Sequence, residues 1–368
     1  MVVFARNSFS LSLKQFSLDF LATPLTKALS LWCNCIVRGM SSGKGATFTS
    51  IGTHDGKFHA DEALACYLLL KLPAFAGASI TRTRNEQILS TLDCIVDVGA
   101  KFEADRLRFD HHQADFNCTF SDAFKTKLSS AGLVYRHFGK ELIGILGGCK
   151  SDALSEENLQ LLYVKCYKDY IEGIDAVDNG IPATKERPAY TKNSISSIVD
   201  RFNPINDEEL PNDQFHKAMN FIGLDFERMV YSLVHKWLPA RHVVETALSH
   251  AGQWDSLGRI VVLHACIPWK LHLLELEREL GMDVKYVLFP DTHSGNWMIQ
   301  TVPASEEDAF VDKMPLPEQW KGKRGEELDA ASGIGGCIFV HASRFIGGNL
   351  TFEGALQMAK EALKLNAS

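Results

Sequence analysis

Apolar and polar residues follow two different periodicities in the first third of the chain, and together they predict an α/β fold. Short β-rich segments alternate with segments in which apolar residues recur at helical spacing. This alternation is typical of a doubly wound parallel sheet, in which functional groups gather at the carboxyl ends of the strands. The predicted strands are 47–54, 78–84 and 93–100, and the predicted helices are 61–72 and 85–92, the second capped by Asn85.

Helical periodicity dominates the middle of the chain, and strand-like segments return near its end. The segment 201–213 is rich in Pro, Asn and acidic residues, as is typical of a connection. Helices are predicted at 127–146 (capped by Ser129 or Ser130), at 155–181, over most of 214–252 and at 350–365, and strands at 258–265, 283–291, 296–303 and 336–342. We therefore predict a parallel-sheet domain at 46–205, a helical connection at 206–255 and a smaller α/β domain at 256–368.

Residues 1–45 differ in composition from the rest of the chain. They are basic and rich in Ser and Leu, and Asp19 is their one acidic residue. This profile is typical of a transit peptide, and it favours a mitochondrial over a plastid destination, with a disordered extension as the alternative. No apolar run reaches the roughly 18 residues of a membrane span, so no membrane partner is expected.

Charge and cysteine content narrow the class of protein. The formal net charge of −7 excludes a basic nucleic-acid binder, although a local basic groove or a metal-rich site remains compatible with it. Nine cysteines are scattered without a CxxC pair, which favours a reducing compartment and argues against a cysteine-bound structural zinc.

Acidic and imidazole side chains follow several of the predicted strands and helices. The candidates are His54, His59 and Asp61; Asp97; Asp110, His111 and His112; and Asp175 with Asp178. Such oxygen and nitrogen donors without thiolates suit Mn²⁺ or Mg²⁺. Ionised carboxylates lie close together only with cations between them, so we predict two metal ions that share a carboxylate and hydrolyse a phosphoester.

Each cluster taken alone also has an ordinary structural interpretation. Asp97 could cap a turn, His54 could be a hydrogen-bonded loop residue, and Asp175 and Asp178 could be polar residues at a helix end. Asp55 and Glu62 are interpreted in this way, as a turn residue and a helix-start residue. The metal-site hypothesis depends on all four clusters occurring at successive element ends.

The same clusters resemble the four motifs of the DHH phosphoesterase superfamily. They read "HDGKFHADE" at 54–62, "VDVG" at 96–99, "DHH" at 110–112 and "VDNG" at 177–180. Over about residues 50–365 the chain more closely resembles the melanocyte-proliferating-gene family of DHH-like exonucleases. The blocks that carry this closer resemblance include "TKLSSAGLVYRHFG" (126–139) and "SGIGGCIFVHASRFIGG" (332–348).

The resemblance implies a metal-dependent 3′–5′ exoribonuclease that acts on single-stranded RNA in mitochondrial and nuclear or nucleolar RNA processing. It also implies a DHH-like catalytic domain, with the active site in the cleft between that domain and a substrate-binding domain. By motif, the metal ligands would be His54, His59, Asp61, Asp97 (bridging), His111 and Asp178, with His112 facing the phosphate and Asp110 supporting it. His59 replaces the middle Asp of the usual first motif, whose spacing is one residue shorter, and this lowers the negative charge of the site by one. The metal therefore stays open between Mn²⁺, which is favoured, and Mg²⁺.

The last glycine-rich segment resembles the substrate-holding segment of DHH enzymes. Its predicted substrate-binding residues are His341, Arg344, Gly347 and Gly348, because glycines let backbone N–H groups approach phosphates. The alternative is a buried strand with a glycine turn. Two other functions also remain open, a phosphatase of dinucleotides or pyrophosphate and a non-catalytic metal-binding RNA regulator.

Overall fold

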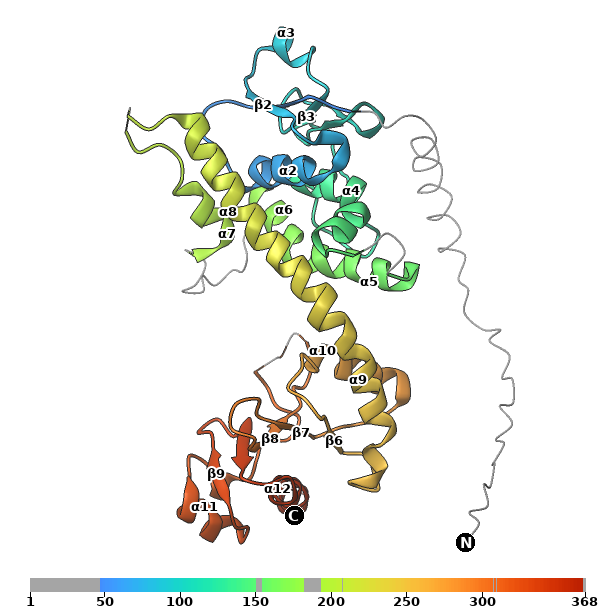
Figure 1. Cartoon of the computed structure of the whole chain (residues 1–368), viewed down its shortest axis with the longest axis vertical. Helices are drawn as coiled ribbons and strands as arrows, with labels where there is room; N and C mark the ends of the chain where they lie inside the picture. Colours follow the sequence, from blue (N-terminus) through green and yellow to red (C-terminus); the bar gives the residue numbers. More distant parts are fainter. Residues whose placement is uncertain are drawn as a thin grey trace, which may run out of the picture. The chain divides into compact units, whose positions relative to one another are not determined.

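The computed structural model describes residues 47–149, 154–181, 193–206, 208–306, 308 and 310–366. The predicted targeting segment 1–45 lies outside these residues. Among the described helices, none is both long and apolar enough to cross a membrane. The chain forms two five-stranded sheets, each with its own helices, so the predicted α/β class is confirmed (Figure 1). The division into domains at 206–255 stays a prediction.

The first sheet has the strand order β2-β1-β3-β5-β4. Neighbouring strands from β2 to β5 are parallel, and β4 pairs antiparallel with β5 at the edge. The prediction of a wholly parallel sheet is therefore wrong at β4, because the two-residue strands β4 and β5 are too short to show a periodicity. The strands are β1 (Ser50–Thr53), β2 (Ser79–Arg82), β3 (Cys94–Val96), β4 (Phe102–Glu103) and β5 (Arg108–Phe109).

Helix α2 (Ala60–Lys71) is central to this half of the chain. Its first ten residues are all buried, which explains why its sequence is apolar on every side and not only along one stripe. It packs against α4 (Ser130–Leu146) and α8 (Pro211–Ser232), and Figure 1 shows these helices beside it. Burial on all sides fixes the first turn of α2, which carries several of the candidate ligands.

The helix predicted at 155–181 is divided by one irregular turn. It consists of α5 (Glu156–Cys166), a π-helical turn (Tyr167–Ile171) and α6 (Glu172–Asp178). Turns of this kind are rare in helices and often occur near functional sites. A second π-helical turn (Leu233–Trp237) joins α8 to α9 (Leu238–Ser249), so the mainly helical prediction for 214–252 is confirmed. Two short helices, α3 (Glu86–Leu89) and α7 (Ile195–Asp200), complete this half.

The second sheet has the strand order β6-β7-β8-β10-β9, and only the β6–β7 pair is parallel. Alternate residues of its strands face opposite cores, one containing α12 and the other containing α9 and α10. Strand β10 was not predicted, because its two glycines are unfavourable in strands. The elements are β6 (Ile260–Val262), α10 (Lys270–Leu280), β7 (Tyr286–Pro290), β8 (Trp297–Thr301), α11 (Gly325–Ser332), β9 (Cys337–Val340), β10 (Ile346–Asn349) and α12 (Phe352–Leu365).

Candidate metal centre

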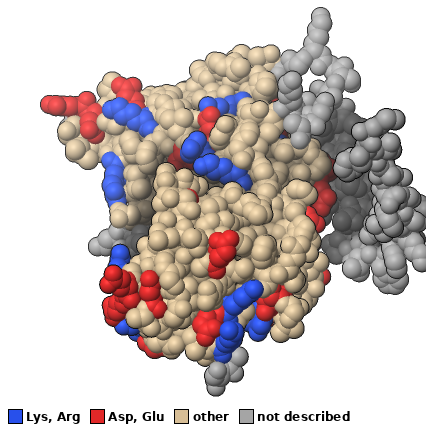
Figure 2. Space-filling view, turned by 60° about the horizontal axis from the view of Figure 1, so that its bottom comes forward, with Lys and Arg blue, Asp and Glu red and all other residues tan. Residues whose placement is uncertain are grey.

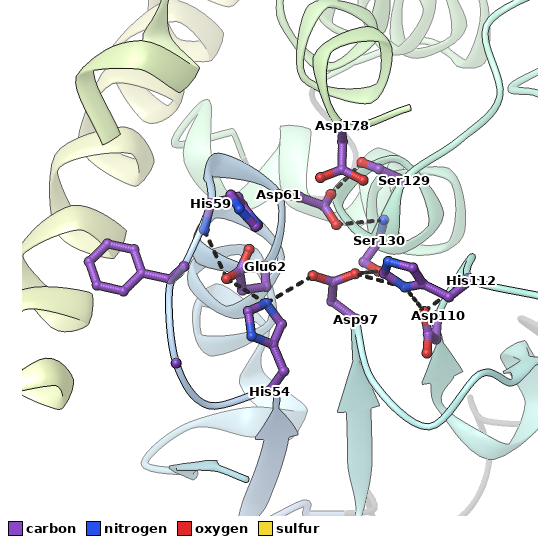
Figure 3. A network of polar contacts seen from close by, with 12 residues as sticks. His54, His59, Asp61, Glu62, Asp97, Asp110, His112, Ser129, Ser130 and Asp178 are labelled. Atoms are coloured by element: carbon purple, nitrogen blue, oxygen red, sulfur yellow. Dashed lines mark hydrogen bonds and ion pairs between the residues drawn. The ribbon is translucent and has the colours of Figure 1, made fainter. Parts of the chain in front are cut away.

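Three adjacent parallel strands deliver acidic and imidazole side chains to one edge of the first sheet. His54 follows β1, Asp97 follows β3, and Asp110 follows β5. Because β1, β3 and β5 are neighbours in that order, their carboxyl ends lie side by side. Figure 3 shows the side chains turned toward one another, with α2 supplying further groups from the opposite side. The expectation that these clusters converge is therefore met by the geometry.

Asp97 lies at the centre of the cluster and is 4% exposed. Its Oδ2 is 3.3 Å from His54 Nε2, and its Oδ1 is 3.5 Å from His111 Nε2 and 3.6 Å from His112 Nδ1. Burial would raise the pKa of this carboxyl, but the imidazoles of His111 and His54 beside it outweigh burial and hold the pKa well below its usual value. One carboxylate thus faces imidazoles on both sides, as a bridging ligand must.

The backbone around Asp97 is strained. Its φ of 56° lies in the left-handed region, where residues other than glycine are uncommon, and Ala100 follows with a φ of 51°. The turn is held from two sides, since Asp97 N donates to Phe109 O at 3.1 Å and Ala100 N donates to Asp110 Oδ2 at 2.5 Å. Strain that surrounding contacts maintain in this way is a feature of functional sites.

His54, His59 and Glu62 form a second group of donors at the first turn of α2. His54 Nδ1 lies 2.9 Å from the carbonyl oxygen of Asp55, which directs Nε2 into the site, 2.9 Å from Glu62 Oε1. Burial opposes protonation of His54, but the hydrogen bonds to Asp97 and Glu62 raise its pKa to about 10. Donor atoms of His54, His59 and Glu62 lie within 4.8 Å of one another.

Asp61 faces the amino-terminal end of α4 and is 1% exposed. Burial raises the pKa of this carboxyl, and so does the negative charge of Asp178. Donors from the start of α4 hold both oxygens, and an anion is favoured at that end of a helix. These donors are Ser130 N at 3.0 Å, Ala131 N at 2.6 Å and the hydroxyl of Ser129.

The two acids at the end of α6 have different surroundings. Asp178 Oδ2 lies 2.9 Å from His111 Nε2, so Asp178 faces the site. Asp175 is fully buried and instead accepts hydrogen bonds from Ser129 N at 2.9 Å, Ser129 Oγ at 2.7 Å and Tyr167 Oη at 2.9 Å. Burial raises the pKa of Asp175 to about 7. The geometry therefore favours Asp178 as the ligand and makes Asp175 a support for the start of α4.

His112 differs from His111 in its exposure. Its side chain is 60% exposed, whereas that of His111 is 7% exposed. His112 Nδ1 lies 2.7 Å from Asp110 Oδ1, and this hydrogen bond raises the pKa of His112. Asp110 therefore orients the ring and favours its protonated form, and Nε2 is the nitrogen that remains to meet a ligand.

Two cavities adjoin the cluster. The first, of about 420 Å³, is lined by His54, His59, Asp97, Asp110, His112 and Asp178 together with the cationic residues Lys57 and Arg84. The second, of about 490 Å³, shares His59 and Asp178 with the first and extends along α6 and α7. All described residues that line either cavity belong to the segment 54–201.

The four predicted substrate-binding residues lie in the second sheet. Gly347 and Gly348 are buried in β10, where they pair with β8 and β9. His341 is exposed in the turn before β10, and Arg344, with a φ of 64°, pairs with Glu318 at 3.2 Å. The two glycines therefore lie in a buried strand, as the alternative interpretation predicts. The substrate-binding role of the four residues stays a prediction.

The donor set fits divalent metal ions. Two further groups have donor atoms within 4.8 Å of one another, Asp97 with His111 and His112, and Asp61 with His111 and Asp178. His111 Nε2 is buried and forms no hydrogen bond of good geometry with the residues described, although it lies close to two carboxylates. Buried polar atoms normally have partners, so an atom of this kind at such a cluster is consistent with a ligand of a divalent ion.

Several residues of this site are not evident from the sequence. Glu62 was interpreted only as a helix-start residue, yet it is fully buried beside His54. The sequence predicts Ser129 or Ser130 as a helix cap, but donors from both residues hold Asp61, and those of Ser129 also hold Asp175. Two consecutive serines before an apolar helix indicate helix capping in the sequence. They do not indicate which carboxylate the serines contact.

The chain is similar to proteins of one family over most of its length. Residues 50–363 match the MYG1 exonuclease family model, whose description is "Uncharacterised protein family (UPF0160)". The "MYG1 exonuclease" of Homo sapiens is 45% identical over 327 residues, which cover 85% of this chain and 85% of that protein. The "MYG1 protein" of Dictyostelium discoideum is 44% identical over 324 residues, which cover 85% of this chain and 96% of that protein.

Proposed function

Because the chain belongs to the MYG1 exonuclease family, we propose that it is a metal-dependent 3′–5′ exonuclease of single-stranded RNA. Nuclease activity follows from the family, whose mammalian members are named exonucleases. The observation that supports a two-metal reaction is the buried carboxylate of Asp97, placed between His54 on one side and His111 on the other. Mn²⁺ is the favoured ion and Mg²⁺ the alternative. We also propose a role in mitochondrial and nuclear RNA processing.

Each residue of the cluster has a role in this proposal. His54, His59 and Asp97 would hold one ion, and Asp97, Asp61, His111 and Asp178 would hold the other. When bound, such ions neutralise phosphoryl oxygens and activate water. His112, protonated and oriented by Asp110, donates a hydrogen bond to the phosphate or a proton to the leaving oxygen.

Contacts with the substrate backbone would come from cationic residues near the cavity. Lys57 and Arg84 line it, each paired with an exposed acid, Asp200 at 2.8 Å and Asp55 at 3.3 Å. A phosphate can compete for such exposed pairs at low cost, since they contribute little to stability. Figure 2 shows basic and acidic side chains intermixed on the face in view.

Replacing His112 by Asn is expected to lower the rate of RNA hydrolysis about 100- to 10,000-fold with little loss of bound metal. The side chain of His112 is largely exposed, and its removal leaves the buried ligands in place. Rates under saturating substrate and metal content after dialysis would be measured together. His242→Asn, at a side chain 86% exposed on α9, is the control and should leave both unchanged. Full activity of His112→Asn would contradict its role.

Metal binding is expected to release protons at neutral pH. The pKa values of His54 and His111 are raised to about 10, so both rings carry a proton at pH 7 that a metal ion must displace. The affinity for Mn²⁺ should therefore rise between about pH 6 and pH 8, by up to tenfold per pH unit for each displaced proton. Calorimetric titrations in two buffers of different ionisation enthalpy measure the release, and identical heats in both would contradict it.

A timed digestion of end-labelled RNA tests the proposed function. Purified full-length protein should shorten RNA labelled at its 5′ end one nucleotide at a time, lose this activity after chelation and regain it with Mn²⁺. Single-stranded DNA, dinucleotides and pyrophosphate are the competing substrates. Hydrolysis of the small phosphates alone would replace the nuclease by a phosphatase, and RNA binding without hydrolysis would replace it by a regulator.

A further inference from the structure

Glu62 occupies the third position of α2 and closes the start of that helix. Its Oε1 accepts a hydrogen bond from His59 N at 2.9 Å, the reciprocal half of a capping box. Closing the helix is a sufficient local reason for a glutamate at this position. It accounts for only one of the two carboxylate oxygens.

The burial of Glu62 requires another explanation. Capping residues usually lie at the surface, but Glu62 is 0% exposed. Its Oε2 is buried and has no hydrogen-bond partner among the described residues. A buried carboxylate oxygen without a partner is unfavourable unless a cation meets it. The contact of Oε1 with His54 Nε2 at 2.9 Å leaves Oε2 unsatisfied.

The neighbours of Glu62 are metal-binding groups. Donor atoms of His54, His59 and Glu62 lie within 4.8 Å of one another, close to the roughly 4 Å that separates opposite ligands of one small divalent ion. Figure 3 shows Glu62 between the two imidazoles and Asp97. The three side chains could therefore hold one ion together.

Charge balance points to the same assignment. Two divalent ions carry four positive charges, and Asp61, Asp97 and Asp178 supply three negative charges at the cluster. His59 is neutral when it binds a metal, so it adds no negative charge. Asp110 is hydrogen-bonded to His112 and is not one of the proposed ligands. With Glu62 the ligands of the two ions include four carboxylates, and the charges are equal.

We propose that Glu62 is a metal ligand, binding through Oε2 the ion that His54, His59 and Asp97 also contact. The proposal rests on the proposed function for the presence of that ion. Glu62 then has two tasks, because Oε1 closes helix α2 while Oε2 supplies the charge that a histidine at position 59 lacks. The affinity for this ion then depends on the conformation of the first turn of α2.

Glu62→Gln separates the two tasks. The amide oxygen of glutamine still accepts the hydrogen bond from His59 N, whereas the negative charge is lost. Chelator-stripped full-length protein would be reloaded with Mn²⁺, and bound metal would be measured by mass spectrometry and by calorimetric titration. We expect one of two Mn²⁺ ions to bind at least tenfold more weakly, with a melting temperature of the metal-free protein that does not fall. Glu86→Gln, an exposed glutamate in the first turn of α3, should bind like the unaltered protein.

Unchanged Mn²⁺ stoichiometry and affinity in Glu62→Gln would overturn the proposal and leave the proposed function intact. Conversely, a protein that binds two Mn²⁺ ions through Glu62 but does not cleave RNA would refute only the nuclease function. If Glu62→Gln does not fold, crystals of the unaltered protein loaded with Mn²⁺ decide the question. An anomalous-scattering peak within bonding distance of Glu62 Oε2 supports the proposal, and a peak on His54 and Asp97 without Glu62 refutes it.

Discussion

Asp97→Asn is expected to reduce phosphodiester hydrolysis at least about 1,000-fold and to abolish tight binding of both metal ions. Two ions sharing one carboxylate contribute several kcal/mol to the stabilisation of the transition state, and each 1.36 kcal/mol is a factor of ten in rate. The amide of the substituted asparagine would retain an oxygen on one side only, so the imidazoles of His54 and His111 would no longer face a common anion.

Asparagine is the informative replacement because of the backbone. Asp97 has a φ of 56°, a conformation that Asn adopts more readily than most residues, so the turn after β3 should remain intact. Asp97→Ala would add conformational strain to the loss of the carboxylate. The difference in metal-free melting temperature between the two variants measures that strain, and the difference in activity should be small.

Asp115→Asn is the matched control for this prediction. Asp115 is an exposed residue a few positions after the histidine pair, and its replacement removes the same charge without touching the cluster. Rates and Mn²⁺ content should match the unaltered protein. If Asp97→Asn kept both ions and more than a tenth of the activity, Asp97 would not be the shared ligand.

The convergence of the cluster was predictable from sequence because it follows from topology. The apolar strand before Asp97 is evident in the sequence, whereas the two-residue strand β5 before Asp110 is not. Both acids lie at the same edge because β3 and β5 are parallel and adjacent. Local pattern also separated the strands from the helices in most of the chain. A local pattern of apolar and polar residues specifies the type of secondary-structure element and the position at which it ends.

The direction of individual side chains was less predictable. Asp61 and Glu62 are consecutive on α2 and point to different partners, Asp61 to the start of α4 and Glu62 to His54. Both can be buried only because α2 is enclosed on all sides, which depends on helices more than sixty residues away. The choice between Asp175 and Asp178 depends likewise on Ser129 and His111. Local sequence contains no information about such distant neighbours.

Gly132→Ala is expected to destabilise the start of α4 by about 3 kcal/mol and to weaken Mn²⁺ binding about 10- to 100-fold. A Cβ at position 132 would lie 2.8 Å from Cγ of Asp175 and would overlap its carboxylate. Asp175 is fully buried and cannot move away without releasing Ser129, whose hydroxyl also holds Asp61. The effect would thus reach the metal ligands through two hydrogen-bonded residues.

Gly144→Ala in the same helix is the matched control. A Cβ at position 144 meets no atom within 4 Å, so alanine should stabilise α4 by up to about 1 kcal/mol through its higher helix propensity. Hydrogen exchange of the α4 amides in the metal-free protein measures both variants. Protection should fall roughly 100-fold in Gly132→Ala and should not fall in Gly144→Ala.

A second background identifies the cause of the expected loss. In a chain that already carries Asp175→Ala, the carboxylate that Cβ would overlap is absent, so adding Gly132→Ala should cost at least about 1 kcal/mol less than it does in the unaltered chain. An equal cost in both backgrounds would show that glycine is needed at position 132 for another reason. A reduced cost would show that a single missing methyl group keeps the Asp175–Ser129–Asp61 connection in place and, through it, one carboxylate of the metal centre.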